Sequence, residues 1–276
     1  MRSASDFVHI RAESCRVKKG LKGDSVLTRE RKQHLLGTLK RDGRILAGET
    51  AVALGVSEDT IRRDLRELAA ERLLLRVHGG ALPASPATES LGARRTLSPA
   101  EKTALARAAC RMLRPGQVIF LDGGTTALEL ARQIDRSLRA TIVTHSPTIA
   151  AELVEHRAEV LVVGGRLFKH SMVAVGAAAA EAIRAIRADV YFMGVTGIHA
   201  EHGLTTGDAE EAAIKRLIAQ SAAEIVVMAS TEKIGAVSSF LILPARSVTQ
   251  LLVPQSASAR ALKPFRTLAM EVTRCR

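Results

Sequence analysis

The sequence from residue 57 to residue 65 is SEDTIRRDL. Ser57 can accept a hydrogen bond from a free backbone N–H at the start of a helix, and the acidic residues after it suit the positive end of the helix dipole. Ile61, Leu65 and Leu68 recur at the spacing of one helix face. The stretch therefore predicts an amphipathic helix that begins after Ser57.

Two further helices are predicted before this one. Apolar residues at helical spacing predict a helix over residues 27–41, and a short helix over residues 46–54 ends at Gly55. The small Ala51 lets two helices approach, Gly55 tolerates a left-handed turn, and the branched Ile61 fills the contact. Together these features indicate a helix-turn-helix.

The outer face of the helix after Ser57 is polar and basic. Because the apolar stripe points inward, the side chains left on the surface are Ser57, Thr60, Arg62, Arg63 and Arg66. An arginine fork can bond O6 and N7 of one guanine, and a threonine can contact a thymine methyl or a phosphate. We predict that this face reads the major groove of double-stranded operator DNA. The alternative is a solvated helix face on which Arg63 pairs with Glu67 one turn further on.

A short strand and a tight return follow this helix. Residues 73–77 are apolar enough for a strand, and residues 78–81 contain two glycines, which predicts a β-wing beside the DNA backbone. His78 is either a phosphate or minor-groove contact or simply a turn residue. The predicted winged helix-turn-helix covers residues 27–81.

Composition points toward a nucleic acid and away from a membrane. The 276 residues carry a formal net charge of +12, and such a surplus favours a polyanionic partner. Aromatic residues make up only 3%, which disfavours base stacking on single strands. Three scattered cysteines and the lack of a long apolar run predict a cytoplasmic protein without disulfides or membrane contact. Residues 1–26 are predicted to be a flexible extension, to which no function is assigned.

Residues 82–100 separate this domain from a second one. Proline, serine, threonine and alanine are frequent there, which predicts a linker. Over residues 101–254 short β-rich runs alternate with helical segments, and this predicts a mainly parallel sheet. The predicted strands are residues 118–121, 141–143, 160–163, 190–193 and 225–228. The fold class is therefore α/β, with a Rossmann-like C-terminal domain and a C-terminal tail over residues 255–276.

The predicted strands end in small or polar residues. In open α/β sheets these ends gather at one edge, where glycines allow close backbone approach and helix N-termini favour anions. We therefore predict a phosphate site from the following residues: Asp122, Gly123, Gly124, Thr125, Thr126, His145, Ser146, Gly164, Gly165, Lys215 and Lys233. The alternatives are tight turns that only cap the next helix, and solvated lysines. Arg166 and Lys169 are further basic candidates.

No cofactor or metal ion is predicted. The loop Asp-Gly-Gly-Thr-Thr at residues 122–126 is neither a Walker A motif nor a G-x-G-x-x-G fingerprint. The cysteines contain no C-x-x-C pair, which argues against a zinc ribbon.

Two groups of motifs resemble one family of bacterial repressors. Residues 57–65 and 76–81 resemble the N-terminal signature of the DeoR family. The sensor domain of that family is similar in fold to ribose-5-phosphate isomerase. This chain resembles that sensor domain at residues 121–126, 164–167, 203–206 and 211–216. The resemblance implies a DNA-binding repressor released by a phosphorylated sugar or polyol, whose phosphate lies at the first glycine loop. It also implies a homo-oligomer, either a dimer or a tetramer.

Two residues depart from the family pattern. His145 stands where members often have Asn, and Ser230 where they often have Asp. An imidazole is bulkier and can titrate, and the missing carboxylate removes an acceptor for a hydroxyl group. These departures favour an atypical effector.

Two other functions are compatible with the sequence. A sugar-phosphate isomerase-like enzyme would use Asp122, Asp208, Glu211 or Lys215 for acid–base chemistry. The second is a DNA-binding protein whose large domain only forms oligomers. We expect that the protein is not an enzyme. The attached DNA-binding domain makes sensing a simpler use of the pocket than catalysis, and a shared fold does not confer activity.

Overall fold

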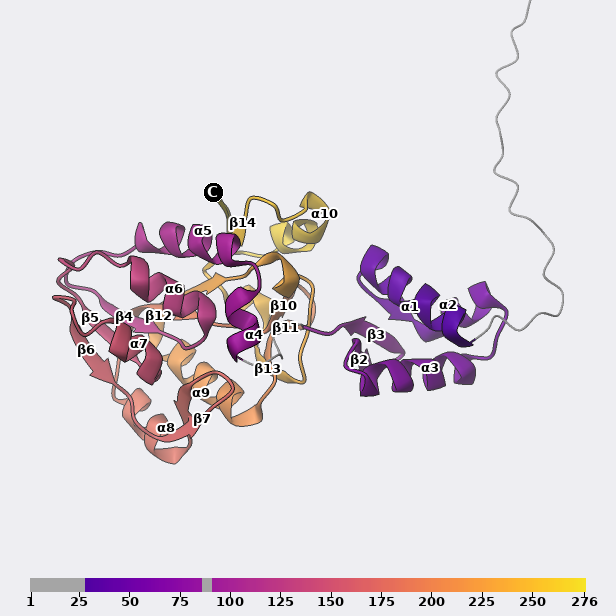
Figure 1. The fold of residues 1–276 in the computed structure, drawn as a ribbon, viewed down its shortest axis with the longest axis horizontal. Helices are drawn as coiled ribbons and strands as arrows, with labels where there is room; N and C mark the ends of the chain where they lie inside the picture. The colour runs from indigo at the N-terminus through magenta and orange to yellow at the C-terminus, as the bar shows by residue number, and fades with distance from the viewer. Residues whose placement is uncertain (1–27, 86–90) are drawn as a thin grey trace, which may run out of the picture.

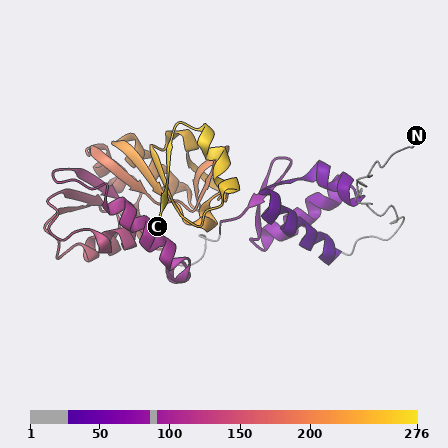
Figure 2. The same ribbon diagram turned by 90° about the horizontal axis from the view of Figure 1, so that it is seen from above.

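The computed structural model describes residues 28–85 and 91–276 and contains two folded bodies joined by one stretch of chain (Figure 1). A view from above shows the same separation (Figure 2). The N-terminal body consists of α1 (Thr28–Asp42), β1 (Ile45–Leu46), α2 (Ala47–Leu54), α3 (Glu58–Ala70), β2 (Leu74–Val77) and β3 (Gly80–Pro83). These elements confirm the predicted winged helix-turn-helix.

Helix α3 packs its apolar stripe into the core of this body. Ile61, Leu65 and Leu68 are at most 2% exposed and cluster with Leu35 of α1. Gly55 follows α2 in the left-handed region, with a φ of 65°. Glycine is the residue that adopts this conformation most cheaply, as the predicted turn requires.

The wing has three strands, whereas the sequence predicted one strand over residues 73–77 and a tight return over residues 78–81. Gly80 and Ala81 of that predicted return belong to β3. β2 and β3 form an antiparallel hairpin, and β1 pairs with the other side of β3. Leu46, which the sequence assigned to the second helix, lies in β1 opposite Gly80. A side chain at Gly80 would overlap the Ile45 carbonyl oxygen, so the close pairing of β1 with β3 requires glycine there.

The C-terminal body alternates helices and strands. Its α-helices are α4 (Leu91–Thr96), α5 (Pro99–Cys110), α6 (Thr125–Gln133), α7 (Pro147–Glu152), α8 (Ala177–Arg184), α9 (Ala209–Gln220) and α10 (Ala259–Leu262). The main sheet contains β4 (Val118–Leu121), β5 (Thr141–Thr144), β6 (Glu159–Val162), β9 (Ala188–Met193), β12 (Ala222–Met228), β14 (Gln250–Pro254) and β15 (Glu271–Cys275). The smaller sheets contain β7 (Arg166–Phe168), β8 (Val173–Val175), β10 (Gly197–His199), β11 (Gly203–Thr206) and β13 (Phe240–Leu243). Short 3-10 turns are η2 (Thr231–Lys233), η3 (Ala245–Ser247) and η4 (Lys263–Thr267).

The main sheet has the strand order β15-β14-β12-β9-β4-β5-β6. All neighbouring strands are parallel, as the alternation of helices and strands predicted. The chain fills one side from β4 to β6 and the other from β9 to β15, so the order reverses between β4 and β9. In open sheets of this kind, ligands bind beyond the carboxyl ends of the strands at such a reversal.

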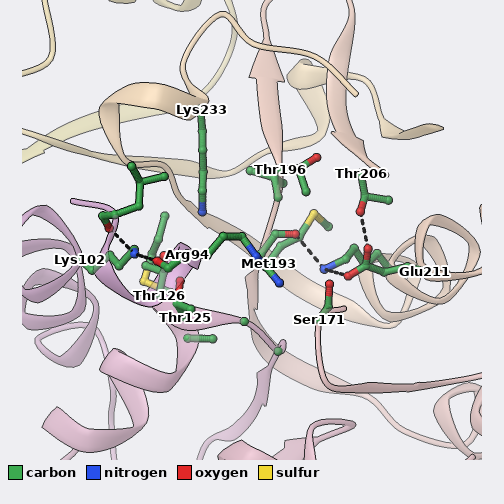
Figure 3. Close-up of a pocket in the computed structure, with 18 of the residues that line it drawn as sticks. Arg94, Lys102, Thr125, Thr126, Ser171, Met193, Thr196, Thr206, Glu211 and Lys233 are labelled. Carbon is green, nitrogen blue, oxygen red and sulfur yellow. Dashed lines mark hydrogen bonds and ion pairs between the residues drawn. The ribbon is translucent and has the colours of Figure 1, made fainter. Parts of the chain in front are cut away.

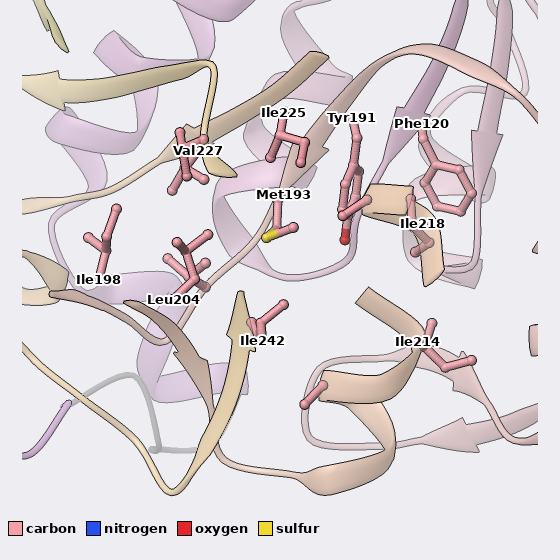
Figure 4. Packing of buried hydrophobic residues seen from close by; sticks show 14 of the residues in the cluster. Phe120, Tyr191, Met193, Ile198, Leu204, Ile214, Ile218, Ile225, Val227 and Ile242 are labelled. Carbon is pink, nitrogen blue, oxygen red and sulfur yellow. The ribbon is translucent and has the colours of Figure 1, made fainter. Parts of the chain in front are cut away.

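Both faces of the main sheet are covered. In β4, Ile119 and Leu121 pack with helices α5, α6 and α7, whereas Phe120 joins the core on the opposite face. There Phe120 lies beside Tyr191 of β9 and near Ile218 of α9 (Figure 4). Burial on two sides explains why the central strands are nearly continuous apolar runs.

Two segments are more ordered than the sequence predicted. The linker assigned to residues 82–100 includes the end of β3, all of α4 and the start of α5. The tail assigned to residues 255–276 includes α10 and β15, and β15 pairs with β14 as the outer strand of the sheet. Only Cys275 in β15 is fully buried, so the strand lacks an apolar run that could reveal it. The predicted extension, residues 1–26, lies outside the described residues.

Candidate functional site

The N-terminal end of α3 is capped as the sequence predicted. The Ser57 side chain accepts a hydrogen bond from the Thr60 backbone N–H at 3.2 Å, and the two hydroxyl groups lie 2.8 Å apart. Arg62 is exposed and pairs with Glu58 at 2.7 Å. These contacts hold the polar face of α3 in place without burying it.

Arg63 and Arg66 are exposed on α3, and within the described ranges neither has an ion-pair partner. The predicted alternative, a pair between Arg63 and Glu67, is absent, and Lys32 of α1 contacts Glu67 at 2.8 Å instead. His78 is exposed in the turn between β2 and β3. The predicted DNA-contacting residues thus lie on α3 and at the tip of the wing, open to a ligand.

A buried ion pair fixes α3 against α1. Asp64 has no exposed surface, and its carboxylate accepts hydrogen bonds from Nε and Nη2 of Arg31, the latter at 3.0 Å. A two-pronged pair of this kind sets the rotation of α3 as well as its distance from α1. It therefore determines which side chains of α3 face outward.

A cleft opens in the C-terminal body at the reversal between β4 and β9 (Figure 3). The loop after β4 and the start of α6 form its floor, and residues from α4, α5, α9 and η2 form its walls. Its polar lining residues are Arg94, Lys102, Thr125, Thr126, Ser171, Thr196, Thr206, Glu211, Lys215, Glu232 and Lys233.

The N-terminus of α6 lies in this cleft without a side-chain cap. Gly124 is the N-cap residue, has a φ of 99°, and carries no side chain that could accept from the first N–H groups of the helix. Thr126 is only 6% exposed, and its hydroxyl has no hydrogen-bond partner in the structure. Free N–H groups and an unpaired buried hydroxyl at a helix N-terminus suit an anionic ligand.

Three buried cations surround that position. Arg94, Lys102 and Lys233 are at most 8% exposed, and the described residues offer none of them an ion pair within 4.0 Å. Burial lowers the pKa of Arg94 and of Lys102, and it lowers that of Lys233 to about 8. In Figure 3 the Lys233 side chain extends toward the middle of the cleft, across from Thr126. Glu232 raises the pKa of Lys102 and Lys233, and Glu211 that of Arg94, but by less than burial lowers it. The three buried charges are therefore costly unless a ligand neutralises them.

Lys215 is a cation of a different kind, because two carboxylates neutralise it. Its ammonium group donates to Asp122 and lies 3.6 Å from Glu211. Glu211 also accepts a hydrogen bond from Thr206. Burial alone would lower the pKa of Lys215, but Asp122 and Glu211 more than offset this and raise it.

Asp122 lies beneath the cleft, fully buried. Its carboxylate accepts hydrogen bonds from the backbone N–H groups of Gly123 and Gly194, both at 2.8 Å, and from the Tyr191 hydroxyl at 2.9 Å. His145 Nε2 lies 2.9 Å from the same carboxylate. Burial would raise the pKa of Asp122, but Lys215 and these donors hold it well below its usual range. The residue joins β4, β5 and β9 at the reversal.

The structure divides the predicted ligand residues into three groups. Those that line the cleft are Gly123, Gly124, Thr125, Thr126, Lys215 and Lys233. Those buried behind it are Asp122, His145 and Ser146, none with exposed surface. His145 therefore contacts Asp122 and the carbonyl oxygen of Ala174 and does not line the cleft itself.

Gly164 and Gly165 form the third group, outside the cleft. They lie exposed at the end of β6, and a side chain at Gly165 would come within 2.8 Å of the Val175 carbonyl oxygen. Close packing against β8 thus explains why residue 165 is a glycine. Arg166 pairs with Glu210 on the surface, and Lys169 is exposed.

Sequence reasoning missed several lining residues. Arg94 lies in the segment predicted to be a linker, and Lys102 lies on a helix, so neither follows a strand. Thr206 belongs to a motif that resembled the sensor domain, and that resemblance was the signal that could have located it. Glu211 was named only as an acid–base candidate of an isomerase-like enzyme, not as a ligand residue.

Neither a metal centre nor a membrane span is found over residues 28–85 and 91–276. No group of three His, Cys, Asp or Glu side chains there could hold a metal ion. No helix of that part of the chain has the length and apolar character needed to span a membrane.

Two domain families match the chain. Residues 31–87 match the DeoR-like helix-turn-helix domain, and residues 98–254 match the DeoR C terminal sensor domain. Helix α4 lies between the two matches, and α5 falls within the second.

Related proteins are named as transcriptional regulators. The HTH-type transcriptional regulator GlpR of Haloferax volcanii is 37% identical over 217 residues, which cover 76% of this chain and 83% of that protein. The Glycerol-3-phosphate regulon repressor of Escherichia coli K12 is 30% identical over 208 residues, covering 75% and 82%. Among solved structures, ribose 5-phosphate isomerase A of Methanocaldococcus jannaschii aligns with a TM-score of 0.37 and 16% identity, over 49% of this chain and 54% of that one. Likeness at that level implies no shared activity.

Proposed function

The chain belongs to the DeoR family of helix-turn-helix transcriptional regulators, and from that premise we propose that it represses a carbohydrate or polyol catabolic operon. In this proposal α3 and the wing bind double-stranded operator DNA. A phosphorylated sugar or polyol binds the cleft and releases the protein from the operator.

The observation that carries the effector class is the set of three buried cations around the start of α6. Arg94, Lys102 and Lys233 lack ion pairs within the described residues, and Thr126 has an unpaired hydroxyl. A phosphate dianion would supply charge to the cations and acceptors to the free N–H and O–H groups.

The opposite wall of the cleft suits the part of the effector that carries hydroxyl groups. Thr206, Glu211 and Ser171 are uncharged or anionic side chains that can exchange hydrogen bonds with hydroxyl groups. A phosphate on one side and hydroxyl acceptors on the other favour a phosphorylated polyol or sugar over inorganic phosphate. The name of the Escherichia coli relative, a glycerol-3-phosphate regulon repressor, agrees with this class.

The cleft is poorly suited to catalysis. Asp122, one of the carboxylates that an isomerase-like enzyme would use, already accepts hydrogen bonds from two backbone N–H groups, Tyr191 and Lys215. Its pKa is held well below its usual range, chiefly by Lys215 against the effect of burial, so it is a weak base. Glu211, another of those carboxylates, contacts Lys215 and accepts a hydrogen bond from Thr206. The related proteins are named as regulators, which agrees with a non-enzyme.

DNA binding in this proposal rests on Arg63 and Arg66, whose guanidinium groups are free of ion pairs within the described residues and exposed on α3. Arg62 can join them by leaving Glu58. A homo-oligomer, a dimer or a tetramer, would then select an operator of repeated half-sites separated by whole helical turns.

The test measures operator binding and release with the full-length chain. A fluorescent duplex from the region upstream of the neighbouring genes is bound, and inorganic phosphate, glycerol 3-phosphate, ribose 5-phosphate and fructose 6-phosphate are titrated in. We expect salt-sensitive binding and release by a phosphorylated member of the panel, but not by the same compound without its phosphate.

Variants separate the two halves of the proposal. Arg63→Ala should weaken operator binding by about tenfold or more and leave effector binding unchanged, with Arg184→Ala on the distant α8 as control. Lys233→Met should retain operator binding and lose release, with the exposed Lys169→Met as control. Release that is equal in the Lys233 and Lys169 variants would contradict the assignment of the cleft.

A further inference from the structure

The segment that connects the two bodies contributes a side chain to the cleft. Helix α4 lies in this connection, between β3 of the DNA-binding body and α5 of the sensor body. Its Arg94 is 8% exposed and lines the cleft. We propose that Arg94 binds the effector's phosphate and that this contact moves the connection between the bodies. Arg94 is then required for DNA release. This inference rests on the function proposed above.

The hydrogen-bonding capacity of the Arg94 guanidinium is only partly satisfied within the described residues. An Nη2 proton is donated to the His170 carbonyl oxygen, whereas Nε is buried and has no hydrogen-bond partner in the structure. Helix α4 packs against α6, which carries Thr126 and its unpaired hydroxyl. Arg94 and Thr126 both line the cleft, and the Arg94 side chain extends toward its middle in Figure 3. One anion could therefore satisfy both orphan groups.

The C-terminal end of α4 is held by another cation of the cleft. The Lys102 ammonium group donates to the carbonyl oxygens of Arg94 and Leu97. Helix α4 is thus fastened at its end to α5, while its Arg94 side chain reaches the ligand position. A charge that draws Arg94 and Lys102 together would move α4 as well.

The other end of the connection is attached to the opposite wall of the same cleft. Pro83, the last residue of β3, and Ser85 exchange backbone hydrogen bonds with Val237 at 3.1 and 3.2 Å. The Ser85 hydroxyl donates to the carbonyl oxygen of Thr196, a lining residue. Val237 stands four residues after Lys233 in the chain. Both ends of the connection therefore contact segments that carry ligand-facing cations.

These contacts give Arg94 a role that Thr126 lacks. Both residues line the cleft, but Arg94 lies on α4 in the connection between the bodies, whereas Thr126 lies on α6 within the sensor body. Removing Thr126 should weaken binding and leave release intact once the site is filled. Removing Arg94 should weaken binding and also abolish release at full occupancy.

The experiment measures two quantities on the full-length chain. Calorimetry gives the affinity for inorganic phosphate and for the tightest-binding member of the panel above. Anisotropy gives the operator affinity without ligand and with that compound at saturation. The variants are Arg94→Ala, Thr126→Ala, and the matched control Arg95→Ala, which changes the exposed neighbour on the same helix.

For Arg94→Ala we expect an affinity loss of about tenfold or more, unchanged operator affinity without ligand, and little change in operator affinity at saturation. Thr126→Ala should lose ligand affinity but release DNA as the unaltered protein does when saturated. Arg95→Ala should match the unaltered protein in both measurements. Unchanged operator affinity also shows that a variant is folded, and Arg94→Lys, which keeps the charge and stem, serves if Arg94→Ala fails this check.

The inference is overturned if the Arg94 variants bind the ligand and release DNA as Arg95→Ala does. It is also overturned if they bind weakly but release fully at saturation, because Arg94 would then act like Thr126. If the unaltered protein binds no phosphorylated compound, the proposed function itself fails, and that result is distinct because it appears before any variant is made.

Discussion

Lys233 illustrates at the scale of one residue why we propose an anionic ligand for the cleft. Burial lowers the pKa of its ammonium group to about 8, and the nearby Lys102, Arg94 and Lys215 lower it as well, while Glu232 opposes them. The charged form is therefore unfavourable in the empty cleft and becomes favourable beside a dianion. A phosphorylated ligand gains from relieving this penalty.

This pKa predicts how phosphate binding depends on pH. Above about 8, Lys233 loses its proton and the affinity for a phosphate dianion should fall. Binding near that pH should be accompanied by proton uptake, because the bound dianion raises the pKa of Lys233. Calorimetry at several pH values, in buffers that differ in ionisation enthalpy, measures both effects.

The control for this prediction is Lys233→Arg, whose side chain stays charged and should give a flatter profile. A change in folding stability with pH does not explain the expected loss of phosphate affinity. Since the folded-state pKa lies below that of an unfolded lysine, this residue makes the fold more stable as the pH rises above about 8. Equal pH slopes in both proteins would contradict the role given to Lys233.

The residues of the cleft differ in how well the sequence predicts them. Gly123, Gly124 and Thr126 follow a buried strand directly, and parallel strands bring such ends together, so they could be located in advance. Arg94 could not, because it lies among residues whose composition indicates a linker. Its burial arises only when α4 packs against α6.

At the scale of elements, two ion pairs join the same two helices, α1 and α3, in different surroundings. Arg31 and Asp64 form a pair that is almost fully buried, whereas Lys32 and Glu67 form one that is partly exposed, with Glu67 about half accessible. Losing one partner of a buried pair leaves a charge without water or counterion. Losing a partner of an exposed pair leaves a charge that water solvates.

Asp64→Ala should therefore lower the free energy of unfolding by roughly 3 kcal/mol, and Glu67→Ala should lower it far less. Denaturant unfolding of the full-length chain, followed by circular dichroism, gives both values. Equal effects of the two variants would show that the Arg31–Asp64 pair does not anchor α3.

Helices and strands also differ in how far the sequence reveals them. The stripe of α3 and the buried runs of β4, β9 and β12 carry a clear apolar pattern, and the structure confirms these elements. β15 carries no such pattern because it is an outer strand with one fully buried residue. β1 is two residues long and exists only because Gly80 lets β3 approach it.

At the scale of the whole molecule, the proposed regulation depends on the connection between the bodies. The sequence predicts two domains in the observed order, yet composition alone cannot show that the connecting residues line the cleft. Pro83 and Ser85 on one side and Arg94 on the other place the route to the DNA-binding body against the ligand position. Binding in the cleft and binding to DNA should therefore be thermodynamically coupled.

The most direct test of this coupling is calorimetric titration of the tightest-binding phosphorylated compound into the free protein and into its operator complex. Because coupling is reciprocal, we predict that the compound binds the complex more weakly, by about fivefold or more, and by the same factor with which it weakens operator binding. Equal affinities for the free protein and the complex would contradict the account.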